Sequence, residues 1–151
     1  MTNDGVSDRV GYGIFGYQTP AEAVQNAIDM SIAAGYSGDA LLILDVAGVG
    51  TTAAGASAMF IDFGAGTVAG SVFSGTDTDL NIVDGVLTTD GISGGLSISV
   101  GPGVVASLDP SSSFSGNFYG NIPVEISGTI EGSGVLDGDP LGFVGIFSVI
   151  D

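Results

Sequence analysis

Apolar and polar side chains alternate along most of the chain after residue 35. In the clearest example, Leu96, Ile98 and Val100 are separated by single serines, and a similar pattern runs through residues 124–131. A period of two is that of a β-strand with one buried face. Runs of this kind, separated by Gly, Asp, Asn, Ser or Pro, predict eight or nine short strands, at residues 36–47, 57–63, 66–75, 80–87, 95–108, 113–120, 123–132 and 141–150.

A helix start is indicated before the first strand. In residues 19–22, TPAE, Thr19 is placed to cap a helix, Pro20 fits the first helical position, and Glu22 completes a capping box. These signals predict one or two helical turns. From Ile28 the pattern again alternates, which predicts a strand, although the spacing of Val24, Ile28 and Ile32 also permits a longer helix.

Regularly spaced short strands with a helix only at the beginning are typical of an antiparallel barrel or sandwich. Glycines stand inside several strands, at Gly70, Gly116, Gly128 and Gly145. Such glycines weaken a strand unless they mark bends or close packing, which small barrels need. We therefore expect an all-β closed antiparallel barrel of about eight strands. The expected organisation is an N-terminal arm with a short helix, residues 1–26, and a single barrel domain, residues 27–151.

The last predicted strand is apolar on both faces. Phe143, Phe147 and Val149 alternate with a second apolar set, Val144, Ile146 and Ile150. Only one of the two faces can point into the barrel, so the other is expected to meet a partner or another subunit. We predict that Val144, Ile146 and Ile150 form an interface.

The charge is strongly one-sided. Seventeen acidic residues stand against one basic residue, Arg9, and the formal net charge is −16. Such a chain repels phosphate backbones and anionic lipid surfaces, so neither nucleic acid nor inserted membrane is an expected partner. No apolar run is long enough for a transmembrane helix, the first ten residues have no signal-peptide pattern, and without cysteine there is no lipid anchor.

The residue types exclude several kinds of catalysis. The chain has no cysteine and no histidine, so thiolate chemistry and the usual serine triads cannot be assembled. A carboxylate pair such as Asp62 with Glu125 is conceivable for glycoside hydrolysis, but any chain with 17 acids offers such pairs. We therefore assign no catalytic residue and expect no enzyme and no cofactor.

Among small ligands, calcium is the one that the acidic side chains of this chain are best suited to bind. The segments 76–79 (TDTD) and 137–139 (DGD) cluster carboxylates at Asp77, Asp79, Asp137 and Asp139. Neither segment spells a complete calcium loop, and Asp-Gly is equally common in hairpin turns. Turn geometry is the favoured interpretation of both.

Three segments resemble the barrel domain of transferrin-binding-protein-B-like surface proteins: residues 11–22, 59–72 and 113–130. The matching patterns are Thr19–Pro20 near the barrel start, D-F-x-x-G-T-x-x-G at 62–70, and G-x-F-Y-G-x-x-x-x-E-x-x-G at 116–128. The resemblance implies the barrel fold and a structural role for the shared residues, which are Asp62, Phe63, Gly116, Phe118, Tyr119, Gly120, Glu125 and Gly128. Glu125 is accordingly interpreted as a strand residue and not as a catalytic acid.

Two functions fit these observations. The first is a non-enzymatic assembly module on the outside of a particle, a viral capsid decoration (cement) protein that docks on itself and on the major capsid protein. A homo-oligomer, with a trimer favoured, and a virion-surface or extracellular location are then expected. The alternative follows the resemblance: a secreted or surface transferrin-binding-like module that captures a host iron protein or haem, with Tyr12, Tyr17, Tyr36, Tyr119 or a methionine as the available haem ligands.

Overall fold

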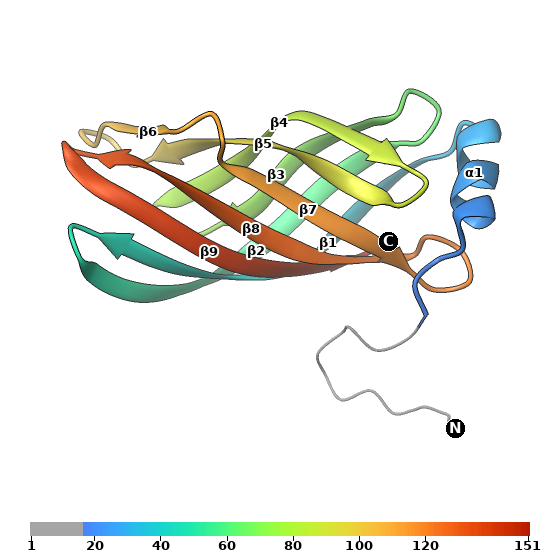
Figure 1. Cartoon of the computed structure of the whole chain (residues 1–151), viewed down its shortest axis with the longest axis horizontal. Helices are drawn as coiled ribbons and strands as arrows, with labels where there is room; N and C mark the ends of the chain where they lie inside the picture. Colours follow the sequence, from blue (N-terminus) through green and yellow to red (C-terminus); the bar gives the residue numbers. More distant parts are fainter. Residues whose placement is uncertain (1–16) are drawn as a thin grey trace, which may run out of the picture.

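The computed structural model describes residues 17–151, which form one helix and nine strands (Figure 1). The elements are α1 (Ala21–Asp29), β1 (Ala33–Val46), β2 (Val49–Asp62), β3 (Thr67–Ser74), β4 (Thr78–Thr88), β5 (Gly91–Val100), β6 (Ala106–Leu108), β7 (Ser113–Tyr119), β8 (Glu125–Leu136) and β9 (Asp139–Ile150).

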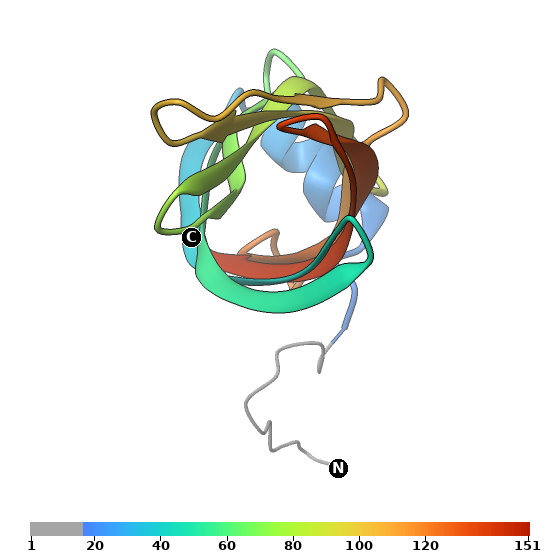
Figure 2. The same ribbon diagram turned by 90° about the vertical axis from the view of Figure 1, so that its left-hand side faces the viewer.

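The strands close into an antiparallel barrel (Figure 2). The last strand, β9, pairs with β1 on one side and with β8 on the other, which joins the two ends of the sheet. Both β6 and β7 pair with β8, β6 near its end and β7 near its beginning, so the two share one position in the ring. The ring therefore has eight positions, and the prediction of an all-β closed barrel of about eight strands with a short N-terminal helix is confirmed.

The segment after residue 20 differs from the prediction. The chain is helical from Ala21 to Asp29, so the strand predicted from Ile28 is wrong, and the alternative of a longer helix was nearer. Val24 and Ala27 face the core, and Gln25 donates to the Asp29 carboxylate one turn later at 2.9 Å. The helix ends where Ser31 takes a positive φ of 52°. The boundary expected between residues 26 and 27 falls inside this helix.

The prediction of a capping box at the helix start is also wrong. Pro20 is the N-cap residue, and no side chain caps the helix. Thr19 is instead buried, where its backbone N–H donates to the Phe118 carbonyl at 2.8 Å. Its hydroxyl has no hydrogen-bond partner within residues 17–151. The connection of the chain to β7 therefore decides how the helix begins.

Two strand boundaries also differ from the prediction. β2 begins at Val49 and not at Ser57, because the small, uncharged residues 50–56 pair with β1 although they lack an alternating pattern. The predicted run 95–108 is split into β5 and β6 by an irregular segment, residues 101–105. Both differences are set by pairing partners that are distant in sequence.

Side chains fill the barrel. Leu42, Ile61, Leu80 and Ile130 are buried together with six of the phenylalanines, and they belong to one continuous core. Packing of this kind is expected of an eight-position barrel, whose interior is just wide enough for its own side chains. Helix α1 covers one end of the barrel (Figure 1) and adds Val24 and Ala27 to the core.

Candidate functional site

The three predicted interface residues all lie on the outer surface of β9. Val144, Ile146 and Ile150 expose 55%, 57% and 61% of their surface, whereas the alternate residues Phe147 and Val149 are buried in the core. The alternation of the strand thus places the second apolar set in solvent. Their side chains are available for an interface, which stays a prediction.

Two residues of β1 extend this surface. Leu41 pairs with Ile146 and Ile43 pairs with Val144 across the β1–β9 ladder. Leu41 and Ile43 expose 41% and 52% of their surface. Directly opposed residues on one face of an antiparallel pair have Cβ atoms roughly 5 Å apart, so the four side chains form one continuous block. We call Leu41, Ile43, Val144 and Ile146 the aliphatic block.

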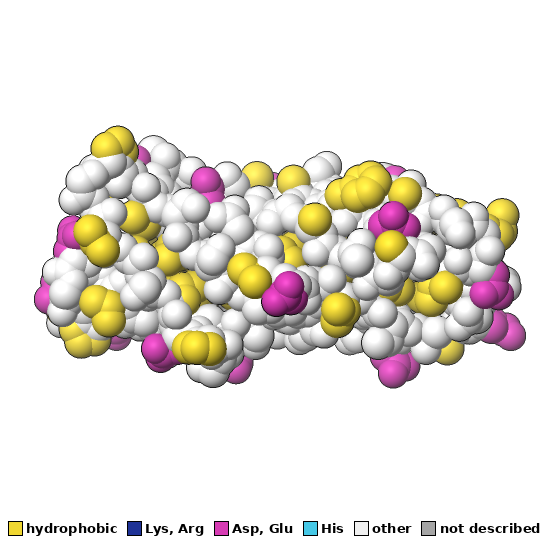
Figure 3. All heavy atoms as spheres, turned by 90° about the horizontal axis from the view of Figure 1, so that it is seen from above, with side chains coloured by type: hydrophobic (Ala, Val, Ile, Leu, Met, Phe, Trp, Pro, Cys, Tyr) yellow, Lys and Arg dark blue, Asp and Glu magenta, His cyan; other side chains and the backbone are white. Residues whose placement is uncertain are grey.

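Carboxylates border the aliphatic block on several sides. Asp39 and Asp45 lie on the same outer face of β1, two positions before Leu41 and two positions after Ile43, and Glu131 of β8 pairs with Val144. No Lys or Arg is present within residues 17–151, since the single basic residue is Arg9. Another face of the barrel likewise shows acidic and scattered hydrophobic side chains without a basic one (Figure 3). An apolar centre with an acidic border is the complement of a partner with a basic border.

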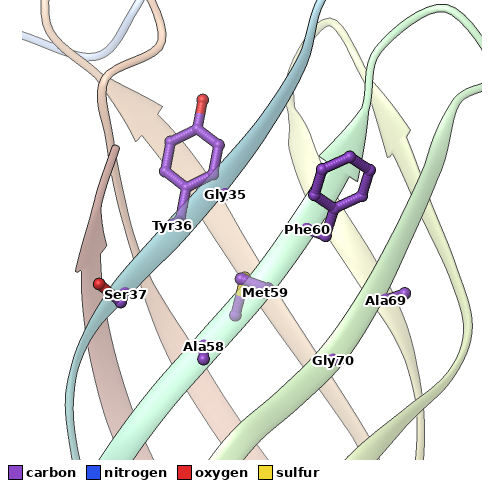
Figure 4. A pocket seen from close by; sticks show the side chains of 8 residues that line it. All are labelled: Gly35, Tyr36, Ser37, Ala58, Met59, Phe60, Ala69 and Gly70. Carbon is purple, nitrogen blue, oxygen red and sulfur yellow. The ribbon is translucent and has the colours of Figure 1, made fainter.

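A shallow hollow lies on β1, β2 and β3, further toward the helix end than the aliphatic block. It has a volume of about 560 Å³, opens to solvent, and is lined by Gly35, Tyr36, Ser37, Ala58, Met59, Phe60, Ala69 and Gly70 (Figure 4). Tyr36 and Met59 are buried, so the exposed large side chain is Phe60, at 52%. Its direct partners on the neighbouring strands are Gly35 and Ala69, which leave the sides of the ring uncovered. The hollow can take up an apolar side chain of a partner.

The side chain of Tyr36 is buried and contributes to the barrel core. Its hydroxyl donates to the Pro123 carbonyl at 2.5 Å and ties β1 to the β7–β8 connection. Burial, and secondly the negative charge of Asp151, raise the pKa of the Tyr36 phenol above its ordinary value of 10.0. The buried, hydrogen-bonded phenol is therefore unavailable as a haem ligand in this conformation.

The raised pKa of Tyr36 predicts a loss of stability in alkali. The folded state favours the neutral phenol, so its contribution is complete below pH 10.0, the ordinary pKa, and is lost progressively as the pH rises above it. We expect the urea midpoint to fall in that range, and to fall less for Tyr36→Phe, which cannot ionise. The variant should be less stable at neutral pH by about 1–2 kcal/mol, because the Pro123 carbonyl loses its donor. Parallel pH curves for the two proteins would contradict the assignment.

The four aspartates proposed for calcium lie in or beside hairpin connections. Asp137 and Gly138 form the β8–β9 turn with φ values of 48° and 85°, and the Asp137 carboxylate accepts the Val105 N–H at 2.9 Å. The Asp79 carboxylate accepts the Ser74 hydroxyl at 2.8 Å. Within residues 17–151 there is no group of three or more acidic or other ligand residues that could hold a metal. Calcium binding by Asp77, Asp79, Asp137 and Asp139 stays a prediction.

The motif residues occupy structural positions. The Asp62 carboxylate accepts the Ala65 N–H at 3.0 Å inside the β2–β3 turn. The rings of Phe63 and Phe118 pack in the core in a tilted arrangement, with their centroids 5.7 Å apart. Gly120 has a φ of 105° in the β7–β8 connection. Tyr119 pairs with Glu125, and Gly116 pairs with Gly128.

The conceivable carboxylate pair is not on neighbouring strands. Asp62 ends β2 and Glu125 begins β8, and β1 and β9 lie between these strands in the ring. Of the possible haem ligands other than Tyr36, Tyr17 is exposed and Tyr119 is half-buried, while Tyr12 lies outside the described residues.

The residues that sequence reasoning missed are Leu41, Ile43 and Phe60. The signal for the first two was present, because residues 41–44 are apolar at every position, as residues 143–150 nearly are. A strand that is apolar on both faces in a small barrel has to expose one set. The partnership of the two strands could not be foreseen, because it depends on barrel closure.

Comparison with known proteins supports the fold. No protein-family model matches the sequence, and no curated protein matches it. Among solved structures, the chain is similar to transferrin-binding protein B of serogroup B Neisseria meningitidis, with 19% identity and a TM-score of 0.65 over 89% of this chain and 27% of that protein. It is also similar to the vaccine antigen transferrin-binding protein B of Haemophilus parasuis, with 16% identity and a TM-score of 0.61 over 90% of this chain and 29% of that protein.

These similarities confirm the fold-level resemblance expected from the motifs. The chain spans less than a third of the length of either protein. No helix within residues 17–151 is long and apolar enough to cross a membrane.

Proposed function

We propose that the chain is a non-enzymatic binding module of the transferrin-binding-like kind, which captures a protein partner on the outer face of β1 and β9. The observation that carries this proposal is the aliphatic block, four exposed and directly paired side chains on adjacent strands. The protein's own side chains pack inside the barrel, so we expect a partner to bind on the outer surface. A rigid barrel with a partly apolar outer face is suited to docking another protein.

The contact would extend beyond the aliphatic block, because a stable interface buries about 800 Å² on each partner. The aliphatic block on β1 and β9 forms the centre, and the Phe60 hollow on β1, β2 and β3 lies beside it, further along β1. Asp39 stands between the two on β1, which places a charge inside the contact area.

The partner is expected to be basic around its apolar contacts. The carboxylates of Asp39, Asp45 and Glu131 would lose water on docking, and Lys or Arg of the partner would replace it. Attraction between opposite charges at the border is screened within about 8 Å at physiological ionic strength. Binding should therefore weaken as salt is added.

Transferrin is the first protein to test. Both similar structures are proteins named for transferrin binding, and this likeness favours the transferrin-binding-like prediction over the capsid decoration prediction, which gains no support from it. The capture of an iron-loaded host protein is thus a more direct proposal than haem capture. An exposed barrel face offers no enclosed site for a haem.

The substitution Ile146→Asp should abolish capture while leaving the barrel folded. Ile146 is exposed, so a carboxylate there costs little stability, but it introduces an unpaired charge into the centre of the contact. We expect the affinity for iron-loaded transferrin, measured by surface plasmon resonance, to fall about 30-fold or more, which corresponds to roughly 2 kcal/mol. Circular dichroism and the melting temperature should stay near those of the unmodified chain.

Val86→Asp is the matched control. Val86 is an equally exposed aliphatic residue, at 47%, on β4, which lies opposite β9 in the ring. Its substitution should change the affinity less than about threefold. An equal loss in both variants would place the contact elsewhere. No binding of transferrin by the unmodified chain at about 100 µM would overturn the proposed partner.

A further inference from the structure

Strand β2 has an open edge over its first half. Residues 49–55 pair with β1 on one side, in register from Val46↔Val49 onward. On the other side the pairing with β3 begins only at Ala56↔Ser74. The β1–β2 hairpin therefore extends beyond the β3–β4 connection, as the lower left of Figure 1 shows. The second half of β2 is paired on both sides, but the first half keeps one unpaired edge.

The geometry of the hairpin tells which backbone groups are unpaired. Ala47 and Gly48 form a two-residue turn with φ values of 53° and 86°, so Val46 and Val49 are the closing hydrogen-bonded pair. In an antiparallel ladder the bonded residues alternate, so Gly50, Thr52 and Ala54 direct their N–H and C=O groups away from β1. No other segment of residues 17–151 hydrogen-bonds to these groups.

The edge lacks the usual protection against pairing with another chain. Natural proteins protect exposed edges with charged side chains, proline or bulges. Residues 46–61 contain no charged residue and no proline, and the bulge between β2 and β3 comes only after Gly55. Val49 is also 66% exposed, so an apolar side chain at this edge remains in water. A strand added here would pair the backbone and cover this side chain.

Charge indicates that a second copy of the chain is the occupant. Every charged residue from 17 to 151 is acidic, so most surfaces of two copies would bring carboxylates together without a cation to pair them. The β2 edge is less affected by this repulsion, because residues 49–55 carry no charge. The nearest acid on β1 is Asp45, opposite Gly50, and on the open side Asp79 pairs with Ser74, where β3 begins to cover β2. Edge-to-edge pairing would separate the two β1 strands by three strand spacings, about 14 Å, which exceeds the screening length of about 8 Å.

We propose that two copies of the chain form a symmetric dimer by antiparallel pairing of residues 49–55 of β2. The two-fold contact is isologous and closes at two copies, in contrast to the trimer expected from the sequence. Its contacts are backbone hydrogen bonds at the β2 edge, one strand away from the aliphatic block, because Thr52 and Ala54 pair with Ile43 and Leu41. Ile146, on the far side of β1, takes no part in them, so the inference does not depend on the proposed capture of a protein partner. Because the remaining force between copies is repulsion between acids, dimerisation should strengthen as salt is added, opposite to the salt dependence proposed for the aliphatic block.

Thr52→Pro tests the pairing directly. Proline removes an N–H that faces the open edge and leaves the hydrogen bonds to β1 in place. Sedimentation of the full chain at about 100 µM should give twice the chain mass of 14.8 kDa, and the proline variant should give the single mass. Thr52→Val, which keeps the amide and the shape, should remain dimeric. The circular dichroism spectra of all three should agree.

Two further measurements locate the contact. Amide hydrogen exchange of Gly50 and Ala54 should slow as the protein concentration rises, because these N–H groups are bonded only in the dimer. Ile146→Asp should leave the dimer intact, which separates this proposal from the proposed function. A chain that sediments as a monomer at 100 µM and high salt, a Thr52→Pro variant that remains dimeric, or a dimer dissociated by Ile146→Asp would overturn the inference.

Discussion

Replacing Gly128 by valine should destabilise the barrel by at least about 3 kcal/mol and leave little folded protein at 37 °C. Gly128 of β8 pairs with Gly116 of β7, and the ring of Phe147 lies over them. A Cβ atom at position 128 would meet Gly116 Cα at 2.7 Å and the Phe147 ring at 2.8 Å, and it would also contact the Ser115 carbonyl. Two of these neighbours are backbone atoms of the paired strand, so β7 and β8 would have to separate.

Gly142→Val is the control for this prediction. Gly142 lies in β9, and a Cβ atom built there would meet nothing within 4 Å. The same substitution should therefore be neutral or slightly stabilising, because valine has the higher strand propensity and restricts the unfolded chain. Urea unfolding followed by circular dichroism compares the two variants. A Gly128→Val protein as stable as Gly142→Val would show that the close packing under Phe147 does not exist.

Truncation of Phe118 to alanine should cost about 4 kcal/mol, the second largest effect that we expect. Phe118 is 1% exposed and packs against Phe63 in the core. Its backbone carbonyl accepts the Thr19 N–H, so the ring lies where the chain before α1 joins β7. The cavity left by the ring cannot collapse without moving this connection.

Phe60→Ala removes the same ring from the surface and is the matched control. Phe60 is 52% exposed, so its truncation should change the free energy of unfolding by less than about 1 kcal/mol. Thermal and urea unfolding of the two variants test the difference. If the two truncations cost the same, the aromatic pair of Phe63 and Phe118 is not part of a tightly packed core.

The strands that sequence analysis located best are those in which alternation and turn residues agree. The predicted runs 113–120 and 141–150 lie within one or two residues of β7 and β9, because each has one buried set of side chains and glycine or proline near its ends. The first half of β2 was missed for the opposite reason. Small residues such as Thr51 and Ala54 carry no pattern of their own, and only β1 beside them makes them a strand.

The helix shows a different cause of error. Residues 28–32 alternate as a strand would, yet they contain the helix end and the turn at Ser31. A period of two over five residues cannot be distinguished from one face of a helix by sequence alone. Burial of Val24 and Ala27 against the end of the barrel that α1 covers decided the outcome, and that surface exists only after the barrel has closed.

Local pattern alone determined that this chain is an acidic barrel whose last strand is apolar on both faces, because side-chain alternation, glycine placement and composition are properties of neighbouring residues. The tertiary structure decided which strands meet. Closure placed Leu41 beside Ile146 and so created the aliphatic block. Residues 49–55 pair with β1 but have no partner on their other side, because β3 ends at Ser74. Strand register and ring closure depend on contacts between residues far apart in the chain. The outer surfaces of the barrel depend on these contacts too, so a local pattern cannot predict them.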